Sequence, residues 1–435
     1  MFPGEKLLVK RPTKLADTIK IAWAYPNSYA VGMAGLGYQL VWWLLEQQAQ
    51  VSVYRLFTDA AEEGWQNCEL MGFTLSWELD YLHVLQMLKK GGIAPRSCDR
   101  SESAPLVFGG GPVLSATPEP FAAIFDVVLL GDAEATIPNL IEAWAQCREL
   151  PQRADRLAKL ATVSGIYVPS LYTCLYNEDG SLAEIKTVNA AAPPNVCKQV
   201  FTPPDDYVAH SVILSDASSW VNMFLVEVAR SCPQECRFCL ASYLTRPFRS
   251  ANVDTLMQKI DLGLQHTRKI GLLGPSVTEH PQFAEIAQRL LARGHGDLDL
   301  SIASIRMDTI DPLVLKMLAQ LGQKSVTIAL ESGSERLREI MKKNLRQDEI
   351  LQGMELIEQS GLTDVKFYGI VGLPGEEDDD IQETIRLLTL LKKKHKTLRI
   401  TFGVSSFVPK AQTPFQWFGR DRDCAAKLEL LRKNL

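Results

Sequence analysis

The stretch VNMFLVEVARSCPQECRFCLASYL, residues 221–244, joins an apolar run to three closely spaced cysteines. The run up to Arg230 has the composition of a buried β-strand. Cys232, Cys236 and Cys239 follow it directly, and they fall within eight positions of a chain that has nine cysteines in total. Thiolates are metal ligands, and three of them on one loop can reach a common centre. The stretch therefore predicts a metal centre at the carboxyl end of a strand.

Downstream of the cysteines, apolar runs alternate with amphipathic stretches, which is typical of βα units and a parallel sheet. Nothing in this segment supplies more than six such units, so we expect a six-stranded partial (β/α)6 barrel of the TIM type. In barrels of this type reactive groups lie on loops at the carboxyl ends of the strands. The predicted strands lie within 221–230, 268–274, 298–304, 324–333, 364–375 and 398–409, and the predicted helices near 253–266, 281–293, 311–321, 335–360 with an interruption, and 378–394.

The first part of the chain repeats the βα pattern and predicts a separate, doubly wound (Rossmann-like) parallel sheet. Its strands are expected within 18–26, 51–57, 68–76, 105–111 and 126–132, and its helices near 36–48, 78–90 and 134–148. The chain is thus α/β, and we expect four segments. They are the Rossmann-like domain (1–164), a β-hairpin and linker around an Asn-Glu-Asp-Gly turn (165–215), the partial barrel (216–418) and a C-terminal helix cut off at its end (419–435).

The composition of the 435 residues is that of a globular protein of more than one domain, with 46% apolar residues, 22% charged residues and a net charge of −5. No broad nucleic-acid-binding face is indicated. Apolar runs stay shorter than the roughly 18 residues that span a bilayer, and the N-terminus lacks a secretory pattern. We therefore expect a cytoplasmic protein without a membrane partner.

Three cysteines in a CxxxCxxC pattern admit three kinds of metal site. One is a zinc site with a fourth ligand elsewhere, and another is an electron-transfer cluster with a distant fourth cysteine. The third is a four-iron cluster with one iron left open to a substrate. The aromatic Phe238 before the third cysteine, and the position after the first strand of a six-unit series, favour the third interpretation.

The motif CPQECRFC, 232–239, resembles the radical S-adenosylmethionine (SAM) enzymes. The resemblance implies a 4Fe-4S cluster held by Cys232, Cys236 and Cys239, whose open iron chelates the amino and carboxylate groups of SAM. An electron from a reducing partner such as flavodoxin or ferredoxin would then split SAM into methionine and a 5′-deoxyadenosyl radical, which abstracts hydrogen from a substrate. The resemblance leaves the substrate unknown.

Other strand ends match the same superfamily and imply further cofactor-binding residues, with Phe238 beside the cluster. Ser304 and Arg306 match positions at the SAM carboxylate, which suits the bidentate guanidinium. Glu331 matches a group near the SAM ribose, and the turn Gly372–Gly375 matches the adenine side. Each has a structural alternative. Arg306 would be an ordinary surface arginine, Glu331 a carboxylate at a helix start, and the turn at Gly372–Gly375 an ordinary glycine-proline turn.

The first domain resembles the N-terminal cobalamin-binding-type domain of a radical SAM subclass, through residues 25–47, 71–92 and 108–144. The resemblance implies that Thr74, Ser76, Gly109, Gly110 and Gly111 lie at the cofactor, where small residues let a ligand approach the backbone. The cobalt-ligating DxHxxG pattern is absent, so cobalamin stays open. The alternative is a domain that closes the barrel mouth or holds substrate.

The cysteine motif itself departs from its relatives at Ser231 and Glu235, where related sequences commonly carry glycine. Glycine eases left-handed backbone conformations, and replacing it there costs on the order of 1 kcal/mol. Glu235 also adds a negative charge beside an anionic cluster.

Three functions are therefore compared. The leading one is a radical SAM enzyme, with cobalamin-assisted methylation or rearrangement as its reaction. A second is a methylthiotransferase-like modifier of tRNA or protein, although the first domain offers only Cys68, Cys98 and Cys147 and lacks a closely spaced trio for a second cluster. The third is a non-catalytic iron-sulfur scaffold or electron carrier.

Overall fold

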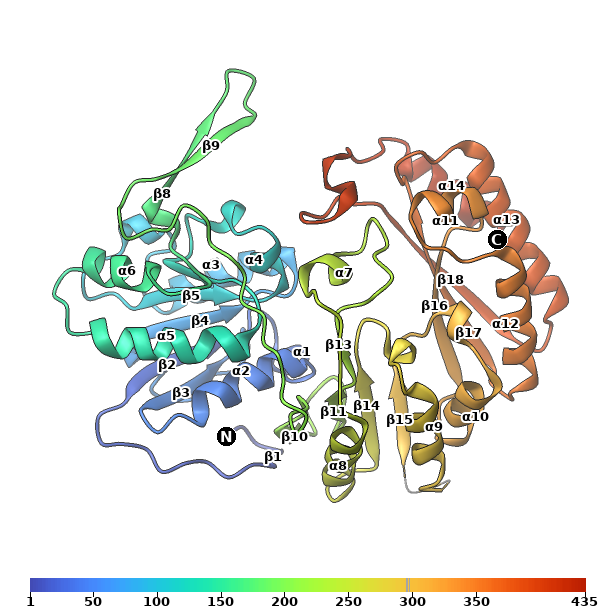
Figure 1. Cartoon of the computed structure of the whole chain (residues 1–435), viewed down its shortest axis with the longest axis horizontal. Coiled ribbons are helices and arrows are strands. Elements are labelled where there is room, and N and C mark those ends of the chain that lie inside the picture. The colour runs from blue at the N-terminus through green and yellow to red at the C-terminus, as the bar shows by residue number, and fades with distance from the viewer. Residues whose placement is uncertain (295, 297) are drawn as a thin grey trace. The chain divides into compact units, whose positions relative to one another are not determined.

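The computed structural model describes residues 1–294, 296 and 298–435, and its contacts divide the chain into two compact units. The first unit comprises residues 1–202 and 211–222, and the second comprises 203–210 and 223–435 (Figure 1). Residues 211–222 return to the first unit because β10 (Ile213–Ser215) pairs antiparallel with β1 (Glu5–Leu7).

The first unit is built on a six-stranded sheet in the order β3-β2-β4-β5-β6-β7. The first five strands are parallel and β7 is antiparallel to β6, so the predicted doubly wound sheet is confirmed. All five predicted strands are present. The strands are β2 (Ile19–Ala24), β3 (Val51–Leu56), β4 (Leu70–Thr74), β5 (Leu106–Gly110), β6 (Val127–Leu129) and β7 (Ile166–Tyr167).

Helices cover both faces of this sheet, which explains why β4 is buried along its whole length. One apolar cluster contains Trp42, Leu45 and Trp144, and a second contains Phe73 and Leu88. The helices are α1 (Tyr29–Met33), α2 (Leu36–Glu46), α3 (Tyr81–Lys90), α4 (Pro112–Ala116), α5 (Ala133–Cys147) and α6 (Arg153–Ala161).

The order of the strands places a topological switch point between β2 and β4. From β2 the chain continues to β3 on one side, and it later returns to β4 on the other side. In doubly wound sheets ligands bind in the crevice outside the carboxyl ends of the strands at such a point. The loops after β2 and β4 therefore form the expected ligand edge of the first unit.

The hairpin predicted in the middle of the chain consists of β8 (Tyr172–Tyr176) and β9 (Leu182–Thr187). The turn between them contains Asn177–Gly180, as the sequence indicated. Figure 1 shows this hairpin extending away from the sheet of the first unit.

The second unit contains the six predicted parallel strands, which neighbour one another in sequence order. Two three-stranded sheets, β11-β14-β15 and β16-β17-β18, are joined by a parallel bridge between Ile305 and Ile328. This is the arrangement of a partial (β/α)6 barrel. The strands are β11 (Phe224–Glu227), β14 (Lys269–Leu273), β15 (Asp299–Ile302), β16 (Ser325–Glu331), β17 (Asp364–Val371) and β18 (Arg399–Ser406), with the short pair β12 (Ala229–Arg230) and β13 (Arg249–Ser250).

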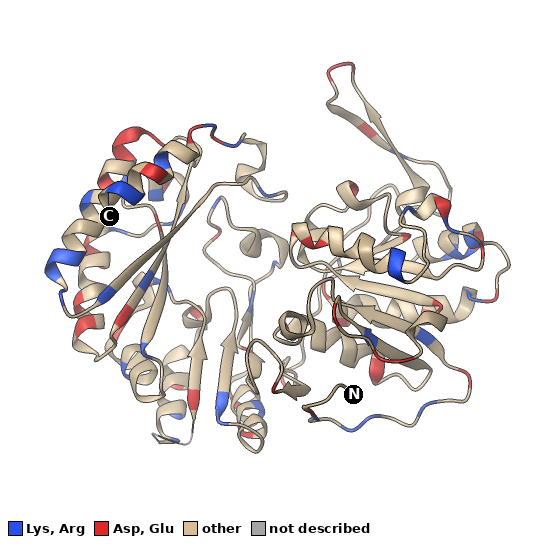
Figure 2. Ribbon diagram, turned by 180° about the vertical axis from the view of Figure 1, so that it is seen from behind, with Lys and Arg blue, Asp and Glu red and all other residues tan. Residues whose placement is uncertain are grey.

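Helices follow the strands of the second unit at the predicted places, and the interruption predicted within 335–360 separates α11 from α12. On α13 the first turn is acidic and the last turn basic, an order that the helix dipole favours. Figure 2 shows both signs of charge on this group of helices. The helices are α7 (Leu240–Leu244), α8 (Val253–Leu264), α9 (Phe283–Leu291), α10 (Pro312–Gln320), α11 (Glu335–Ile340), α12 (Gln347–Gln359), α13 (Asp378–Lys394) and α14 (Cys424–Asn434).

No helix in the described part of the chain combines the length and the apolar character needed to cross a bilayer.

Candidate cofactor site

Charged and thiol side chains follow successive strands of the second unit at their carboxyl ends. Cys232 follows β11 and β12, and Glu279 ends the short turn after β14. Arg306 follows β15, Glu331 is the last residue of β16, and Gly372 comes directly after β17. Because the carboxyl ends of parallel strands lie at the same edge, these residues share one end of the strand series.

The cysteine loop is fixed to the end of α11 by its backbone. The Arg237 amide donates to the Met341 carbonyl at 2.9 Å, and the Arg237 carbonyl accepts from the Phe415 amide at 3.1 Å. Phe238 is partly buried and packs against an apolar cluster beside the loop. Phe238 therefore anchors the loop by packing. The cluster consists of Leu337, Met341, Leu373, Phe407 and Phe415.

Ser231 and Glu235, the two departures from glycine, both have left-handed backbones, with φ of 71° and 54°. The strain expected at these positions is thus present. The charge of Glu235 is compensated, because Lys342 lies 2.8 Å from its Oε2 atom and Arg246 pairs with its Oε1 atom. Glu235 therefore adds little net negative charge beside the cysteines.

The thiols of the loop are unbridged, like all nine cysteines. The Cys232 thiol donates to Oε2 of Glu279 at 3.6 Å. Burial raises the pKa of Cys232 to about 11, and burial also raises the pKa of Cys236, against the opposing charges of Lys343 and Arg306. A metal bound here must displace the thiol protons, so binding would release protons.

Within the described residues, no three His, Cys, Asp or Glu side chains lie close enough to hold one metal ion. A four-iron cluster poses a different requirement, because each thiolate ligates a separate iron. Three unbridged thiols on one anchored loop fit a cluster of that kind in number, and the charges of Lys343 and Arg306 favour the thiolate of Cys236.

Glu331 forms a buried ion pair with Lys343, with 3.5 Å between Oε1 and Nζ. Glu331 has a left-handed backbone, with φ of 69°, at an irregularity in the pairing of β16 with β17. Burial raises the pKa of Glu331, and the charge of Lys343 opposes this effect. Glu331 does not cap a helix, because Ser334 caps α11 by accepting from the Leu337 amide.

Arg306 is largely buried, so the alternative of a surface arginine is wrong. Its Nη2 and Nε atoms donate to the two Asp308 oxygens at 2.6 and 3.0 Å. Its Nε atom also lies 3.9 Å from Oε1 of Glu279. Ser304 lies half-buried two residues earlier. A ligand carboxylate at Arg306 would therefore share the guanidinium with Asp308.

The turn after β17 requires glycine at two positions. Gly372 and Gly375 have φ of 76° and 79°, which other residues rarely adopt. A Cβ on Gly372 would lie 2.3 Å from Sγ of Cys424, so α14 also excludes a side chain there. The Gly372 amide donates to Oε2 of Glu376 at 2.6 Å.

Three charged residues of this edge, Glu279, Asp308 and Lys343, were missed in the sequence. Glu279 could have been found, since it follows the second predicted strand. Lys343 could not, because it follows a helix and no strand, and it reaches the site only through the conformation of the loop after α11. The buried Arg338 donates to the carbonyls of Leu345 and Ser332 and so folds the loop 341–346 back over the site.

The predicted residues of the first unit lie at the carboxyl ends of β4 and β5. Thr74 is buried and pairs with Gly110, while Ser76 is exposed. A Cβ on Gly109 would meet Leu114 at 2.5 Å, and one on Gly111 would meet the Leu75 carbonyl at 2.8 Å. The closest atoms to a Cβ on Gly110 are 3.8 Å away. Close packing within the chain thus explains why glycine is needed at positions 109 and 111. Gly110 has no such close neighbour, so a ligand can approach it.

Further polar groups lie near Ser76 at the switch point of this sheet. The Asn27 amide donates to Oδ1 of Asp80 at 3.1 Å. His83 bonds to the Pro26 carbonyl at 2.8 Å through Nδ1. Exposed apolar side chains accompany these groups, namely Trp77, Leu79 and Leu82.

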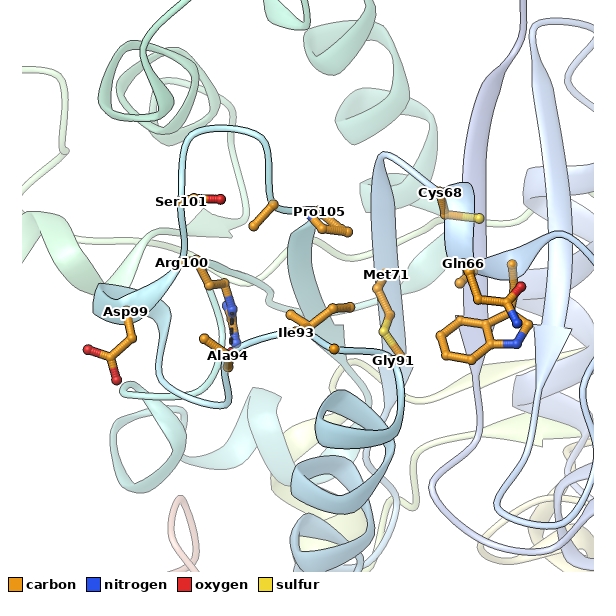
Figure 3. A pocket seen from close by; sticks show the side chains of 14 residues that line it. Gln66, Cys68, Met71, Gly91, Ile93, Ala94, Asp99, Arg100, Ser101 and Pro105 are labelled. Carbon is orange, nitrogen blue, oxygen red and sulfur yellow. Dashed lines mark hydrogen bonds between the residues drawn. The ribbon is translucent and has the colours of Figure 1, made fainter.

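A cavity of about 290 Å³ lies in the first unit away from the switch point (Figure 3). Cys68, Met71 and Pro105 line it at the amino ends of β4 and β5, opposite the switch-point edge. Arg100 also lines it, but its guanidinium is already bonded to Asp126 and to backbone carbonyls. The guanidinium of Arg100 is therefore already engaged, and Asp99 is the other charged residue in the lining.

Two family models match the chain. Residues 37–169 match the N-terminal domain of radical SAM proteins, and residues 226–388 match the radical SAM superfamily.

Relatives of known sequence resemble the chain at low identity. An uncharacterized protein of Methanocaldococcus jannaschii is 27% identical, over 95% of this chain and 83% of the relative. A tRNA-2-methylthio-N(6)-dimethylallyladenosine synthase of Sulfurihydrogenibium is 25% identical over 38% of this chain and 39% of the relative. An uncharacterized methyltransferase of Pyrococcus horikoshii is 25% identical over 64% of this chain and 56% of the relative. The chain thus matches less than two thirds of the length of the second and third relatives.

Two solved structures share the fold. The radical SAM methyltransferase TsrM of Kitasatospora setae superposes with a TM-score of 0.61 at 12% identity, over 92% of this chain and 75% of TsrM. The cobalamin-dependent SAM radical enzyme OxsB gives a TM-score of 0.55 at 15% identity, over 89% of this chain and 53% of OxsB. Both matches cover the two units of the chain.

Proposed function

The chain belongs to the radical SAM superfamily, and from this premise we propose that it is a cobalamin-dependent radical SAM enzyme that transfers a methyl group. Membership makes it an enzyme whose cofactors are a 4Fe-4S cluster and SAM. The use of cobalamin, methyl transfer and the residue roles below are our proposal.

In this proposal each strand end of the second unit has one task. Cys232, Cys236 and Cys239 hold the cluster, which supplies the electron that cleaves SAM. Arg306 orients the SAM carboxylate, for which a guanidinium provides paired donors. Glu331, held in place by Lys343, accepts from the ribose hydroxyls. The turn at Gly372 receives the adenine side.

The observation that carries the assignment is the grouping of charge around Cys236. The positive charges of Lys343 and Arg306 act on this thiol, as does the negative charge of Glu331. These residues come from the ends of β15 and β16 and from the loop after α11. The two cations favour the thiolate and the anionic cluster it would hold, and carboxylates pair with both of them, Glu331 with Lys343 and Asp308 with Arg306.

Cobalamin is proposed for the switch-point edge of the first unit. Support comes from the doubly wound order of the sheet, the open approach at Gly110 and the exposed apolar side chains near Ser76. TsrM has been solved with cobalamin and a [4Fe-4S] cluster bound, and OxsB with aqua-cobalamin and SAM bound. Methyl transfer is the reaction proposed because TsrM is a methyltransferase.

A methylthiotransferase-like activity is less well supported. Such a role needs a second cluster in the first unit, for which Cys68, Cys98 and Cys147 are the cysteines before the hairpin. Cys68 and Cys147 are buried while Cys98 is exposed, and the three do not share one loop. The tRNA-modifying relative matches 38% of this chain.

The test is anaerobic reconstitution with iron and sulfide, reduction with dithionite, and measurement of 5′-deoxyadenosine and S-adenosylhomocysteine, with and without cobalamin. A radical SAM enzyme is expected to consume SAM, and a cobalamin-dependent one should bind cobalamin with a change in its visible spectrum. Failure to bind SAM would leave the non-catalytic iron-sulfur scaffold. SAM turnover without any effect of cobalamin would limit the first unit to a structural or substrate-holding role. A flavodoxin or ferredoxin replacing dithionite would identify the reducing partner.

A further inference from the structure

The C-terminal helix α14 is bound to the turn after β17 by a buried ion pair. We propose that Lys427 is a positioning residue that holds the turn Gly372–Gly375 in its SAM-binding conformation through Glu376. This inference rests on the proposed function, in which that turn receives the adenine side of SAM.

A continuous chain of polar contacts leads from α14 to the turn. Nζ of Lys427 lies 2.8 Å from Oε2 of Glu376, and the same Oε2 accepts from the Gly372 amide at 2.6 Å. Nζ also contacts Oδ2 of Asp421 at 2.6 Å. The ammonium group therefore fixes the carboxylate that fixes the turn's first amide.

The side chains of the Lys427–Glu376 pair are largely buried. The side chain of Glu376 is 2% exposed and that of Lys427 is 14% exposed. Removing one partner leaves the other charge buried without compensation, which is strongly unfavourable. Without Lys427 we expect Glu376 to move toward water or to take up a proton, and either change weakens its bond to Gly372.

Packing between α14 and the turn is an independent contact. Cys424 lies against Gly372 so closely that no Cβ fits, and its thiol donates to the Val371 carbonyl at 3.7 Å. Cys424 and Leu431 belong to one apolar cluster with Val371 and Ile381. Because this packing persists without Lys427, the loss of the ion pair should loosen the turn without detaching the helix.

A groove of about 1010 Å³ lies between these two elements. One side comes from the turn, through Gly372, Leu373 and Pro374, and the other from residues 418–430. Lys427 and Glu376 both line the groove. The ion pair thus lies between the turn and the helix, so losing it should change the conformation of the turn.

The variant Lys427→Met tests the proposal, with Lys433→Met as the matched control. Lys433 lies on the same helix, is 70% exposed and pairs with Glu429 at 3.6 Å. Hydrogen exchange of the protein without SAM should show about tenfold faster exchange at the Gly372 amide in Lys427→Met, since an amide that loses its acceptor opens more readily. Lys433→Met should exchange like the wild type.

Equilibrium dialysis of the reconstituted proteins then measures SAM affinity. Lys427→Met should bind SAM about tenfold more weakly at an unchanged iron content, and Lys427→Arg should restore most of the affinity because it keeps the charge. Glu376→Gln removes the charge at nearly constant size and should weaken binding in the same direction, which provides a test if Lys427→Met does not fold.

Unchanged SAM affinity in both Lys427→Met and Glu376→Gln, beside a wild type that binds SAM, would overturn the proposal and leave the proposed function intact. Faster exchange at Gly372 with unchanged affinity would show that the pair serves stability alone, and would also overturn it. A wild type that holds the cluster but binds no SAM would overturn the proposed function, and this inference with it.

Discussion

Lys343 and Glu331 form an ion pair beside the candidate cluster site, with side chains that are 8% and 9% exposed. The two residues are twelve positions apart and come from the end of β16 and from the loop after α11. Each supplies the charge that the burial of the other requires. The pair therefore affects both the stability of the second unit and the position of Glu331 at the site.

Replacing Lys343 by Met should destabilise the second unit by about 3 kcal/mol, because Glu331 then remains buried without a partner. The double variant Lys343→Met/Glu331→Gln should recover much of this loss, since no uncompensated charge remains. The free energy of unfolding of both variants is measured by urea titration, with hydrogen exchange of the β16 amides as the probe. Equal stability of the single and double variants would show that the two charges do not compensate each other.

The sequence predicted the strands of both units because each carries its own apolar signal. Along β17, for example, buried and more exposed residues alternate from Asp364 to Val371, which is the pattern of a strand. The pairing of β1 with β10 was not predictable, because strands of three residues are too short to show a period.

Residues on the cysteine loop and at strand ends were predictable, whereas residues brought in by long-range contacts were not. The carboxyl ends of the predicted strands locate Cys236, Arg306 and Glu331. Lys343 reaches Glu331 because Arg338 donates to the Leu345 carbonyl of the following loop and to the Ser332 carbonyl before α11, and no spacing in the sequence records these contacts. The role of Lys427 depends likewise on how α14 packs.

The assignment of the cluster ligands predicts different results for two cysteines. Cys236→Ala should abolish the visible absorption of the reconstituted 4Fe-4S cluster, because Cys236 is one of three thiols on the anchored loop. Cys197→Ala should leave the absorption unchanged, since Cys197 is exposed in the segment after the hairpin. Iron content and visible absorption measure the difference. Equal losses in the two variants would mean that the ligands are misassigned.

Ser231 occupies a left-handed backbone position that is 1% exposed. Ser231→Gly should relieve this strain, whereas Ser231→Ala keeps it and removes the same hydroxyl. The glycine variant should therefore be more stable than the alanine variant by about 1 kcal/mol. Urea unfolding midpoints of the two variants provide the comparison. An alanine variant as stable as the glycine variant would show that the backbone at this position bears no strain.

Gly110 and Gly109 are adjacent in β5 but should respond differently to substitution. Gly110→Leu should fold, because the closest atoms to its Cβ are 3.8 Å away, and it should reduce cobalamin binding at least about tenfold by filling the approach to the sheet edge. Gly109→Ala should instead destabilise the first unit by about 1–3 kcal/mol, because its Cβ would lie 2.5 Å from Leu114.

Spectral titration with cobalamin and thermal unfolding separate these two effects. If Gly110→Leu binds cobalamin as the wild type does, the switch-point edge near Thr74 and Ser76 is not the cobalamin site. If both variants lose stability equally, Gly110 is enclosed by the chain like its neighbour, and the open approach inferred at this position is wrong. Loss of cobalamin binding in Gly110→Leu at wild-type stability would support the site, because a filled surface position affects a ligand without disturbing the core.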